Sequence, residues 1–506
     1  MSDTPDNALP DDAQPDDLPE QVRIRRAKYD RLMADPQRAP FPVTVPRTES
    51  LADVRAAFPD LEPDTQTGKQ VGVTGRVIFV RNTGKLCFAT LREGGVELQA
   101  MLSVGSVGEQ SLADWKADVD LGDQVFVTGE VISSRRGELS VLADSWRITA
   151  KALRPLPVAH KPMSEEARVR QRYVDLIVRP EARRMVQLRA QVIASLRQTL
   201  ADSDYLEVET PVLQLIHGGA AARPFNTHLN AFDLPMSLRI ALELPLKRCI
   251  VGGIERVYEI GRIFRNEGVD STHSPEFTML ESYQAYGDYH TMADHTRALI
   301  QNAAAAVGIT KPTTAEGVEI DLFGEWRWVT VYGEVSAAVS RPVDPDTDVE
   351  ALTAIAADHG VALKSEWGHA QIVLELFEKL CEHTYTSPTF VADFPREVKP
   401  LARHHRTDAR LAEAWDLIIG GIEVATAFSE LVDPVEQREL LVAQSLAAAA
   451  GDPEAMQLDE DFLTALEYGM PPTGGMGMGV DRLVSLLTGK GIRETILFPL
   501  LKPIGD

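Results

Sequence analysis

The sequence predicts an α+β protein in which a small N-terminal β-barrel is followed by a larger domain with an antiparallel sheet flanked by helices. Two observations carry this prediction. Short alternating strands with glycine turns fill residues 71 to 150, and an amphipathic helix followed by strand patterns occupies the chain from residue 181 onward. The 506 residues are enough for two to four domains with large cores.

The composition is that of an ordinary soluble globular protein, with 44% hydrophobic and 25% charged residues. No apolar run approaches the length of a bilayer span and the N-terminus lacks the regions of a signal peptide, so we expect no membrane partner and a cytoplasmic location. Cys87, Cys249 and Cys381 are far apart, which indicates neither a zinc site nor a disulfide framework. The net charge of −24 argues at first against a nucleic-acid partner, but phosphate binding needs only a local basic surface.

Acidic and basic residues are segregated at the N-terminus. Residues 1 to 21 hold seven acidic residues, four prolines and no base, which predicts a disordered tail. Residues 22 to 152 are expected to form an N-terminal helix and the barrel domain. The helix carries bases at positions 23, 25, 26, 28 and 31. This pattern fits a solvated helix face and a phosphate-contacting helix equally well.

Within the barrel, the strand patterns break at Thr83-Gly84, Gly94-Gly95 and Arg136-Gly137, as hairpins should. Four or five such strands in about 80 residues predict a closed barrel of the OB type, a common platform for single-stranded nucleic acid. Phe88 could stack on a base, while Gln99 and Glu138 could hydrogen-bond a base edge. Taken singly, Phe88 would more often be core and Gln99 more often surface.

Residues 153 to 180 are expected to form a basic linker between the two folded parts, with arginines at 168, 170, 172 and 179. A basic hinge that contacts nucleic acid and ordinary exposed helix charge are equal alternatives. An amphipathic helix over residues 181 to 203 then opens the larger domain, predicted to span residues 181 to 506. Residues 290 to about 400 show helical patterns with proline-marked loops, which predict a helical insertion.

The segment from residue 259 to residue 289 predicts a wide hairpin. Two alternating runs are separated by a loop rich in turn residues, from Asn266 to Pro275. Such a hairpin could hold a small ligand. Its candidate binding residues combine one cation, two carboxylates, an imidazole, an aromatic ring and a phenol: Arg265, Glu267, Glu281, His273, Phe277 and Tyr283.

A second hairpin is predicted around Gly420-Gly421. If these glycines form a two-residue turn, Ile419 pairs with Ile422, Ile418 with Glu423 and Leu417 with Val424. Asp416 and Glu423 then share a face as diagonal neighbours, about 7–8 Å apart. Two carboxylates so placed suit Mg²⁺ bridged to ATP phosphates. Further along, Thr426, Phe428 and Glu430 are expected to alternate onto the other side.

Glycines 474, 475, 477 and 479 precede Asp481-Arg482 and a helix. A glycine-rich turn before a helix is weak evidence of a phosphate site when it stands alone. The pattern GxxxxGK[ST] is absent, which argues against an ordinary P-loop NTPase.

Together these motifs resemble those of class II aminoacyl-tRNA synthetases, and the string RNEG…HSPEFTMLE is closest to the bacterial type of lysyl-tRNA synthetase. The resemblance covers about residues 20 to 503. It implies an OB-fold anticodon-binding domain, a class II catalytic domain and a homodimer formed through the helix over residues 181 to 203 and the strand after it. The amphipathic face of this helix alone could as easily pack within the chain. The implied reaction joins L-lysine and ATP to lysyl-adenylate and pyrophosphate, and then transfers lysine to the 3′ end of tRNA(Lys).

The resemblance also implies residue roles. Arg265 and Arg482 would be the catalytic arginines, on the α- and γ-phosphates. ATP would be bound by Arg265, Glu267, His273, Phe277, Glu423, Gly479 and Arg482, with Mg²⁺ on Asp416 and Glu423. The amino acid would be bound by Gly219, Glu243, Glu281, Tyr283, Thr426, Phe428 and Glu430. In the barrel, Phe88, Gln99 and Glu138 would read the anticodon.

Several positions depart from the family pattern, namely Ser237, Leu242, Pro245, Thr426 and Ala427. A proline in a helical stretch and an added methyl could reshape the amino-acid pocket. A divergent paralogue with an altered pocket, for a lysine analogue or inhibitor resistance, is therefore the alternative hypothesis. An amino-acid activator with a non-tRNA acceptor would not need the anticodon readers, and a pure tRNA-binding protein would not need both motif arginines and both metal carboxylates.

Overall fold

A computed structural model describes residues 18–157, 162–270, 273–314, 317–365, 367–449 and 456–503. The chain forms two compact units, Met1–Arg183 and Arg184–Asp506. Most of the predicted acidic tail, residues 1–17, lies outside the described residues. The first helix already begins at Glu20 and Leu18 is buried, so the tail prediction extended too far. Among the helices of the described chain, none is long and apolar enough to cross a membrane.

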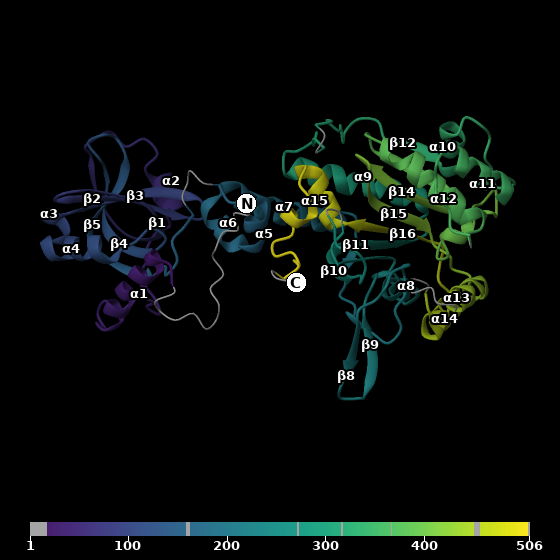
Figure 1. The fold of residues 1–506 in the computed structure, drawn as a ribbon, viewed down its shortest axis with the longest axis horizontal. Coiled ribbons are helices and arrows are strands. Elements are labelled where there is room, and N and C mark those ends of the chain that lie inside the picture. Colours follow the sequence, from purple (N-terminus) through teal and green to yellow (C-terminus); the bar gives the residue numbers. More distant parts are fainter. Residues whose placement is uncertain are drawn as a thin grey trace. The chain divides into compact units, whose positions relative to one another are not determined.

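The first unit contains the predicted closed barrel, with strand order β1-β2-β3-β5-β4 (Figure 1). Alternate residues of β2 are buried, since Cys87, Ala89 and Leu91 point inward. Trp115 on α4 packs into the same core. The elements of the barrel are α2 (Leu51–Ala57), β1 (Gln66–Thr83), β2 (Leu86–Glu93), β3 (Val96–Ser103), α3 (Val104–Val107), α4 (Glu109–Asp118), β4 (Gln124–Ser133) and β5 (Leu139–Ala150).

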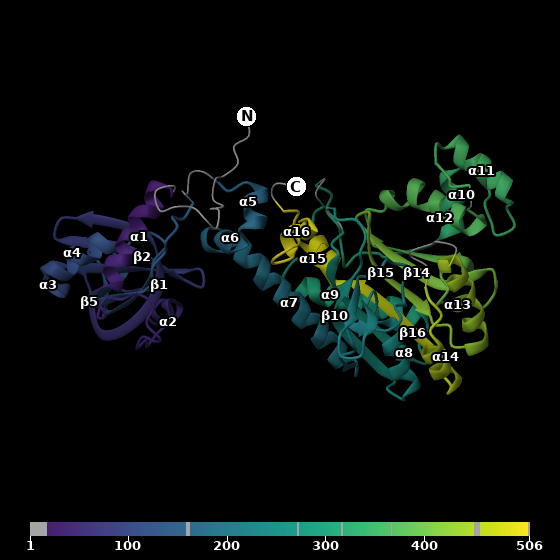
Figure 2. The same ribbon diagram turned by 60° about the horizontal axis from the view of Figure 1, so that its bottom comes forward.

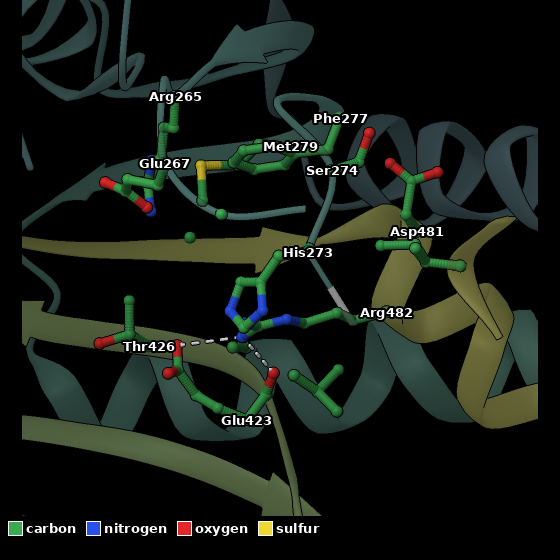
Figure 3. A pocket seen from close by; sticks show the side chains of 16 residues that line it. Arg265, Glu267, His273, Ser274, Phe277, Met279, Glu423, Thr426, Asp481 and Arg482 are labelled. Atoms are coloured by element: carbon green, nitrogen blue, oxygen red, sulfur yellow. Dashed lines mark hydrogen bonds and ion pairs between the residues drawn. The ribbon is translucent and has the colours of Figure 1, made fainter. Parts of the chain in front are cut away.

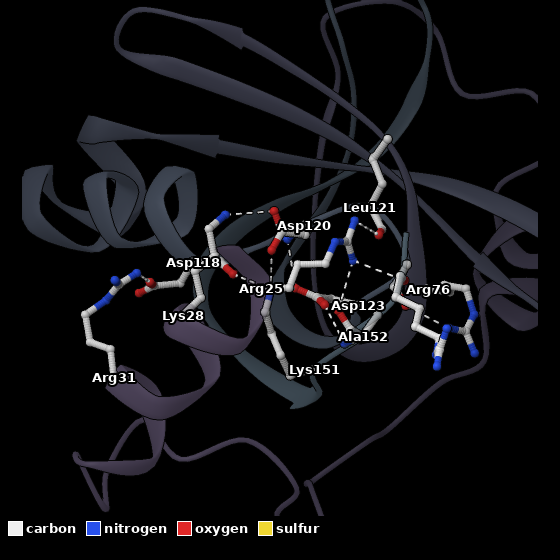
Figure 4. A network of polar contacts seen from close by, with 12 residues as sticks. Arg25, Lys28, Arg31, Arg76, Asp118, Asp120, Leu121, Asp123, Lys151 and Ala152 are labelled. Carbon is white, nitrogen blue, oxygen red and sulfur yellow. Dashed lines mark hydrogen bonds and ion pairs between the residues drawn. The ribbon is translucent and has the colours of Figure 1, made fainter. Parts of the chain in front are cut away.

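Basic side chains of helix α1 (Glu20–Met33) attach the helix to the barrel (Figure 4). Arg25 is buried and donates to the carbonyls of Ala152 and Leu121, both at 2.9 Å. Lys28 pairs with Asp120 at 2.7 Å, and Arg31 pairs with Asp118. Three of the five basic side chains thus have partners within the protein. For these three, neither predicted alternative holds: they are neither a solvated helix face nor free to contact phosphate.

The predicted basic linker is largely helical and belongs to the first unit, as α5 (Glu165–Arg170) and α6 (Arg172–Val178). Arg172 and Arg179 both pair with buried Asp175 at 3.1 Å, and Arg170 pairs with Glu166 at 2.6 Å. Intramolecular helix charge therefore accounts for these three arginines.

The second unit is built on an eight-stranded sheet, β12-β13-β14-β15-β16-β11-β10-β6, which is antiparallel except for its two edge pairs. Its strands are β6 (Leu206–Glu207), β10 (Arg256–Phe264), β11 (Glu276–Ala285), β12 (Arg327–Thr330), β13 (Thr389–Pro395), β14 (Leu411–Ile419), β15 (Ile422–Ser429) and β16 (Thr473–Gly479). A small sheet is formed by β7 (Leu213–Gln214), β8 (Asn226–Leu229) and β9 (Leu234–Leu238).

Helices cover both faces of the large sheet (Figures 1 and 2). One face packs on α7 (Pro180–Asp202), α9 (Tyr289–Ala306) and α15 (Val480–Thr488) through residues such as Tyr258, Leu280 and Trp415. The other face packs on α8 (Glu243–Val251) and α14 (Glu460–Glu467) through Val257 and Tyr283. Because strand side chains alternate, odd-numbered residues of β11 face α8. The same unit also contains α13 (Pro434–Ala449) and α16 (Ile492–Thr495).

Residues 290 to 400 are not one helical insertion. α9 lies under the sheet, and β12 and β13 extend it. Only the part between these two strands forms a separate helical layer with its own core. That layer contains α10 (Val331–Ala338), α11 (Val349–Asp358), α12 (His369–Leu380) and η2 (Glu382–Thr384), and η3 (Arg396–Val398) follows β13. Helical periodicity found these helices, whereas the apolar runs of the short strands could not be told from buried helix segments.

Candidate active site

The predicted wide hairpin is formed by β10 and β11, which pair from Arg256↔Gln284 to Phe264↔Glu276. Its loop carries the polar residues that follow Phe264. β11 also pairs with the glycine strand β16, and β16 pairs with β15. The three predicted motifs, far apart in sequence, therefore lie on adjacent strands of one sheet.

A cavity opens over these strands (Figure 3). Its lining includes seven residues predicted to bind ATP, namely Arg265, Glu267, His273, Phe277, Glu423, Gly479 and Arg482. Met279, Asp481 and Ile492 also line it and were not predicted.

Arg265 lies deep in this cavity. Its Nε donates to the carbonyl of Ile240 at 3.2 Å, and its guanidinium lies 5.4 Å from the centre of the Phe277 ring. Burial lowers the pKa of Arg265, while the carboxylates of Glu267 and Glu281 oppose this shift. A buried guanidinium beside an aromatic ring can bind a planar anion and a stacked base together.

Arg482 lies on the other side of the cavity, at the start of α15. It donates to the carbonyl of Glu423 at 2.7 Å and lies 3.7 Å from that residue's carboxylate (Figure 3). Its neighbour Asp481 is buried, accepts from the Thr278 amide at 2.6 Å and pairs with Arg189. Asp481 thereby fixes the start of α15 to β11 and to α7.

Two other predicted residues of this cavity have protein partners in the loop region. Glu267 accepts from the Arg223 amide at 3.3 Å. The His273 ring contacts the Asp270 carboxylate at 2.9 Å.

An adjoining cavity is lined by all seven residues predicted to bind the amino acid: Gly219, Glu243, Glu281, Tyr283, Thr426, Phe428 and Glu430. Arg265 and Met279 line both cavities and thus connect them.

Glu281 is buried at the centre of the second cavity. It accepts from the Leu242 amide at 2.8 Å and from the Tyr283 hydroxyl at 2.9 Å. Burial, and then the nearby Glu243 carboxylate, raise the pKa of Glu281 to about 7. The same burial raises the pKa of Tyr283 well above its usual value, so this phenol stays a donor.

Lys247 ties the other two acids together. It is fully buried, lies 2.6 Å from Glu243 and pairs with Glu430. Burial raises the pKa of Glu430 to about 8, against the opposing effect of Lys247. These three carboxylates and one ammonium would carry a net charge of −2 if all were ionised. The cavity therefore favours a ligand with two cationic groups.

Two glycines shape this cavity. Gly219 has a φ of +87°, and a Cβ there would meet those of Ala241 and Glu243 at 3.1 Å. At Gly475 on β16, a Cβ would lie 2.0 Å from the Glu430 carboxylate and 2.4 Å from the Tyr283 ring. Gly475 is therefore the floor against which both side chains pack.

We expect Gly475→Ala to displace Glu430 and Tyr283 and to weaken amino-acid binding at least about tenfold, with a loss of stability of about 1–3 kcal/mol from overpacking. Thermal melting and the KM for the amino acid would measure both effects. Gly324→Ala is the matched control, because its Cβ would make only ordinary contacts of 3.4–3.5 Å. Equal amino-acid KM values for the two variants would contradict the role of Gly475.

The second predicted hairpin is present, with one error of register. Ile419 pairs with Ile422 and Ile418 with Glu423, but Leu417 pairs with Ala425 instead of Val424. A β-bulge inserts one residue here and reverses the alternation that follows. Thr426, Phe428 and Glu430 therefore line the same cavity as Asp416 and Glu423, and the prediction that they face the other side is wrong.

The two carboxylates predicted to bind metal differ in their surroundings. Burial, and then the neighbouring Asp416 carboxylate, raise the pKa of Glu423. This mutual repulsion, with oxygen donors on one cavity, fits a hard divalent cation. Asp416, however, already accepts from Lys399 at 2.9 and 3.0 Å and from Thr426 at 2.6 Å.

In the barrel, the three predicted anticodon readers lie on its outer surface. Phe88 and Gln99 are on adjacent strands, with Gln99 opposite Thr90, and neither belongs to the core. Arg81 covers the Phe88 ring at 4.7 Å. Gln99 donates to Ser140 at 2.8 Å, and the exposed Glu138 carboxylate lies 3.4 Å from Arg55.

The departures from the family pattern are absorbed by the fold. Pro245 lies in the first turn of α8, where no intrahelical donor is lost. Leu242 is buried in the core between the sheet and α8, and Ala427 is buried in the core between the sheet and α9. Ser237 donates to Asn226 at 3.1 Å.

Sequence reasoning also missed Lys247, Lys399 and the role of Gly475 as the pocket floor. Lys247 had a local signal, since Glu243 and Lys247 are spaced i, i+4 on a helix. Lys399 had none, because the strand pairing that brings it to Asp416 is not local.

The comparisons with known proteins agree with this geometry. Residues 164–502 match the tRNA synthetases of class II (D, K and N), and residues 71–149 match the OB-fold nucleic acid binding domain. The chain has the fold and the domains of a class II tRNA synthetase. The chain is 60% identical to the lysine–tRNA ligase of Kineococcus radiotolerans over 490 residues, which cover 96% of this chain and 98% of that protein. The chain therefore belongs to the lysine–tRNA ligase family.

Two further relatives are less identical to the chain. The lysine–tRNA ligase 1 of Mycobacterium tuberculosis (strain H37Rv) is 58% identical over 495 residues, covering 96% of this chain and 98% of that protein. The lysylphosphatidylglycerol biosynthesis bifunctional protein LysX of Mycolicibacterium vanbaalenii is 50% identical over 492 residues, which cover 96% of this chain but 44% of that longer protein.

Proposed function

We propose that the chain activates L-lysine with ATP and transfers the lysyl group to the 3′ end of tRNA(Lys). One observation carries the choice of lysine. The second cavity is lined by Glu243, Glu281 and Glu430, and Arg265 also lines it. Lys247 pairs with Glu243 and Glu430 and so offsets only part of the charge of these three acids. Lysine brings the two ammonium groups that this cavity needs and one carboxylate for the arginine.

In the activation step, the lysine carboxylate attacks the α-phosphate and pyrophosphate leaves. Arg265 would hold the carboxylate and the α-phosphate together, because it lines both cavities. Phe277 would stack on adenine, Glu267 would accept from its amino group, and Arg482 with His273 would hold the γ-phosphate. The step needs positioning and charge neutralisation, and no side chain has to remove a proton.

Within the second cavity, Glu281 and the backbone of Gly219 would hold the α-ammonium of lysine. Glu430 and Tyr283 would hold the side-chain ammonium, with Glu243 behind them. Mg²⁺ is the cofactor we propose, held in this cavity by the carboxylate of Glu423, beside Asp416. When bound, it would neutralise charge on the phosphates.

ATP–pyrophosphate exchange with each of the standard amino acids tests the proposal directly. Exchange with lysine alone is expected. A protein that binds ATP but does not exchange with lysine would refute it. Exchange with a different amino acid would favour the divergent paralogue, for which neither the relatives nor the pocket gives support.

We expect lysine binding to release protons near neutral pH. In the free protein, Glu281 and Glu430 have raised pKa values of about 7 and about 8, so both are partly protonated at pH 7. A bound ammonium favours the carboxylate form and lowers these pKa values. Affinity for lysine should therefore rise between pH 6 and about 8. Calorimetry in two buffers of different ionisation enthalpy at pH 7.5 measures the release, and buffer-independent heats would contradict it.

In the barrel, we propose that Phe88, Gln99 and Glu138 read the anticodon of tRNA(Lys). Phe88→Ala should raise the Kd for tRNA(Lys) by about 5- to 150-fold, because stacking on one base contributes about 1–3 kcal/mol. Filter binding measures this change. Phe41→Ala, which removes another exposed ring of the same unit, is the control. Equal Kd values for both variants would place the anticodon elsewhere.

We also propose a homodimer and a cytoplasmic location. α7 and the segments after it leave apolar side chains exposed in the single chain, including Val186, Leu206, Leu213 and Leu215. A second copy that covers them would explain this exposure. Analytical ultracentrifugation tests the dimer.

A further inference from the structure

Lys399 forms an ion pair with Asp416, one of the two carboxylates predicted to bind metal. It follows η3, and its ammonium donates to both oxygens of Asp416, at 2.9 and 3.0 Å. Both side chains are only 17% exposed. Lys399 and Asp416 line the same cavity as Glu423 and Arg265, so this ion pair belongs to the active site and not to the outer surface.

The coordination of Asp416 leaves little room for a second cation. Thr426 donates to the oxygen Oδ1 that Lys399 also contacts, and Lys399 holds Oδ2 as well. Mg²⁺ needs close, nearly octahedral oxygen ligands. A Mg²⁺ ion bound to Asp416 would lie beside the Lys399 ammonium, where two positive charges repel each other.

Other contacts hold Lys399 in this position. Its ammonium lies 4.3 Å from the centre of the Phe394 ring and 5.7 Å from that of Phe428. Moving away from Asp416 would give up the ion pair and the cation–π contacts together. The lysine is thus fixed on Asp416 from two sides.

We propose that Lys399 takes the place of one divalent cation at Asp416, so that the ATP-bound site carries a fixed ammonium there and binds metal through Glu423. This inference rests on the proposed function only in assuming that the first cavity binds ATP. It makes Lys399 a charge-compensating residue of the activation step, and it predicts fewer divalent ions per site than two free carboxylates would hold.

The test counts Mn²⁺ ions, as a spectroscopic substitute for Mg²⁺, on the full chain saturated with the β,γ-methylene analogue of ATP. Lys399→Met keeps most of the side chain against Phe394 but removes the charge. Electron paramagnetic resonance should show one more Mn²⁺ per site in this variant, or its weakest Mn²⁺ bound at least tenfold more tightly. Lys311→Met is the matched control, since Lys311 lies near Glu319 and Asp321 at 3.4 and 3.5 Å on the surface.

Asp416→Asn gives a second readout that does not depend on the folding of the first variant. If Lys399 occupies Asp416, removing the carboxylate charge leaves the number of bound Mn²⁺ ions unchanged. If Asp416 is a metal ligand, the count falls by one, which would overturn the proposal. Equal Mn²⁺ numbers and affinities in wild type and Lys399→Met would overturn it too. Because no lysine is present, failure of lysine exchange is a separate result.

Discussion

Glu281→Gln is expected to lower kcat/KM for lysine in ATP–pyrophosphate exchange by about 10²- to 10³-fold. The substitution keeps the size of the side chain and an oxygen that can accept from the Leu242 amide, but it removes the negative charge. Removing one partner of a buried charge pair costs about 3–5 kcal/mol, because the other charge is left buried and unpaired. Here the unpaired charge would be the α-ammonium of lysine.

Glu276→Gln is the matched control for this variant. Glu276 begins the same strand, β11, but its side chain is 56% exposed and its nearest cation, Arg262, is 3.6 Å away. We expect this control to change kcat/KM less than about twofold, since exposed pairs contribute about 0–1 kcal/mol. Proton release should also fall in Glu281→Gln, because one of the two titrating carboxylates is gone. Equal kinetics in the two variants would mean that Glu281 does not contact lysine.

The parts of the site that could be predicted from the sequence are those with a strict local pattern. The β10–β11 hairpin has alternating strands on both sides of a turn-rich loop, so its residues and their faces follow from a period of two. In the barrel, glycines follow β1 and β2 directly, and the five strands form the predicted closed barrel.

The errors in the prediction have physical causes. The β15 bulge adds one residue that no pattern in the sequence marks, and it moves Thr426 and Glu430 to the face of Asp416. Basic residues of α1 form ion pairs with acidic residues about 90 positions later in the chain, such as Asp120. Helical periodicity carries no information about such distant partners. Lys399 reaches Asp416 for the same reason, through the pairing of β13 with β14.

The identity of the cation between the two cavities should matter as much as its charge. Arg265→Lys keeps a positive charge, yet we expect it to lower exchange by about 10²- to 10³-fold. A lysine ammonium is a point charge on a flexible stem, whereas a guanidinium can donate two parallel hydrogen bonds to one anion and still reach a second. Loss of one donor aimed at the charge of a transition state has an effect of this size.

The split between kcat and KM distinguishes this role from simple attraction. If Arg265 aligns the lysine carboxylate with the α-phosphate, kcat falls while the KM for each substrate changes much less. If Arg265 only attracts anions, Arg265→Lys retains kcat and raises KM. Arg262→Lys is the control, because Arg262 lies on the same strand with its side chain 46% exposed. A guanidinium that serves both cavities must also keep its stacking on Phe277, so Phe277→Leu should reproduce part of the kcat loss by letting Arg265 move.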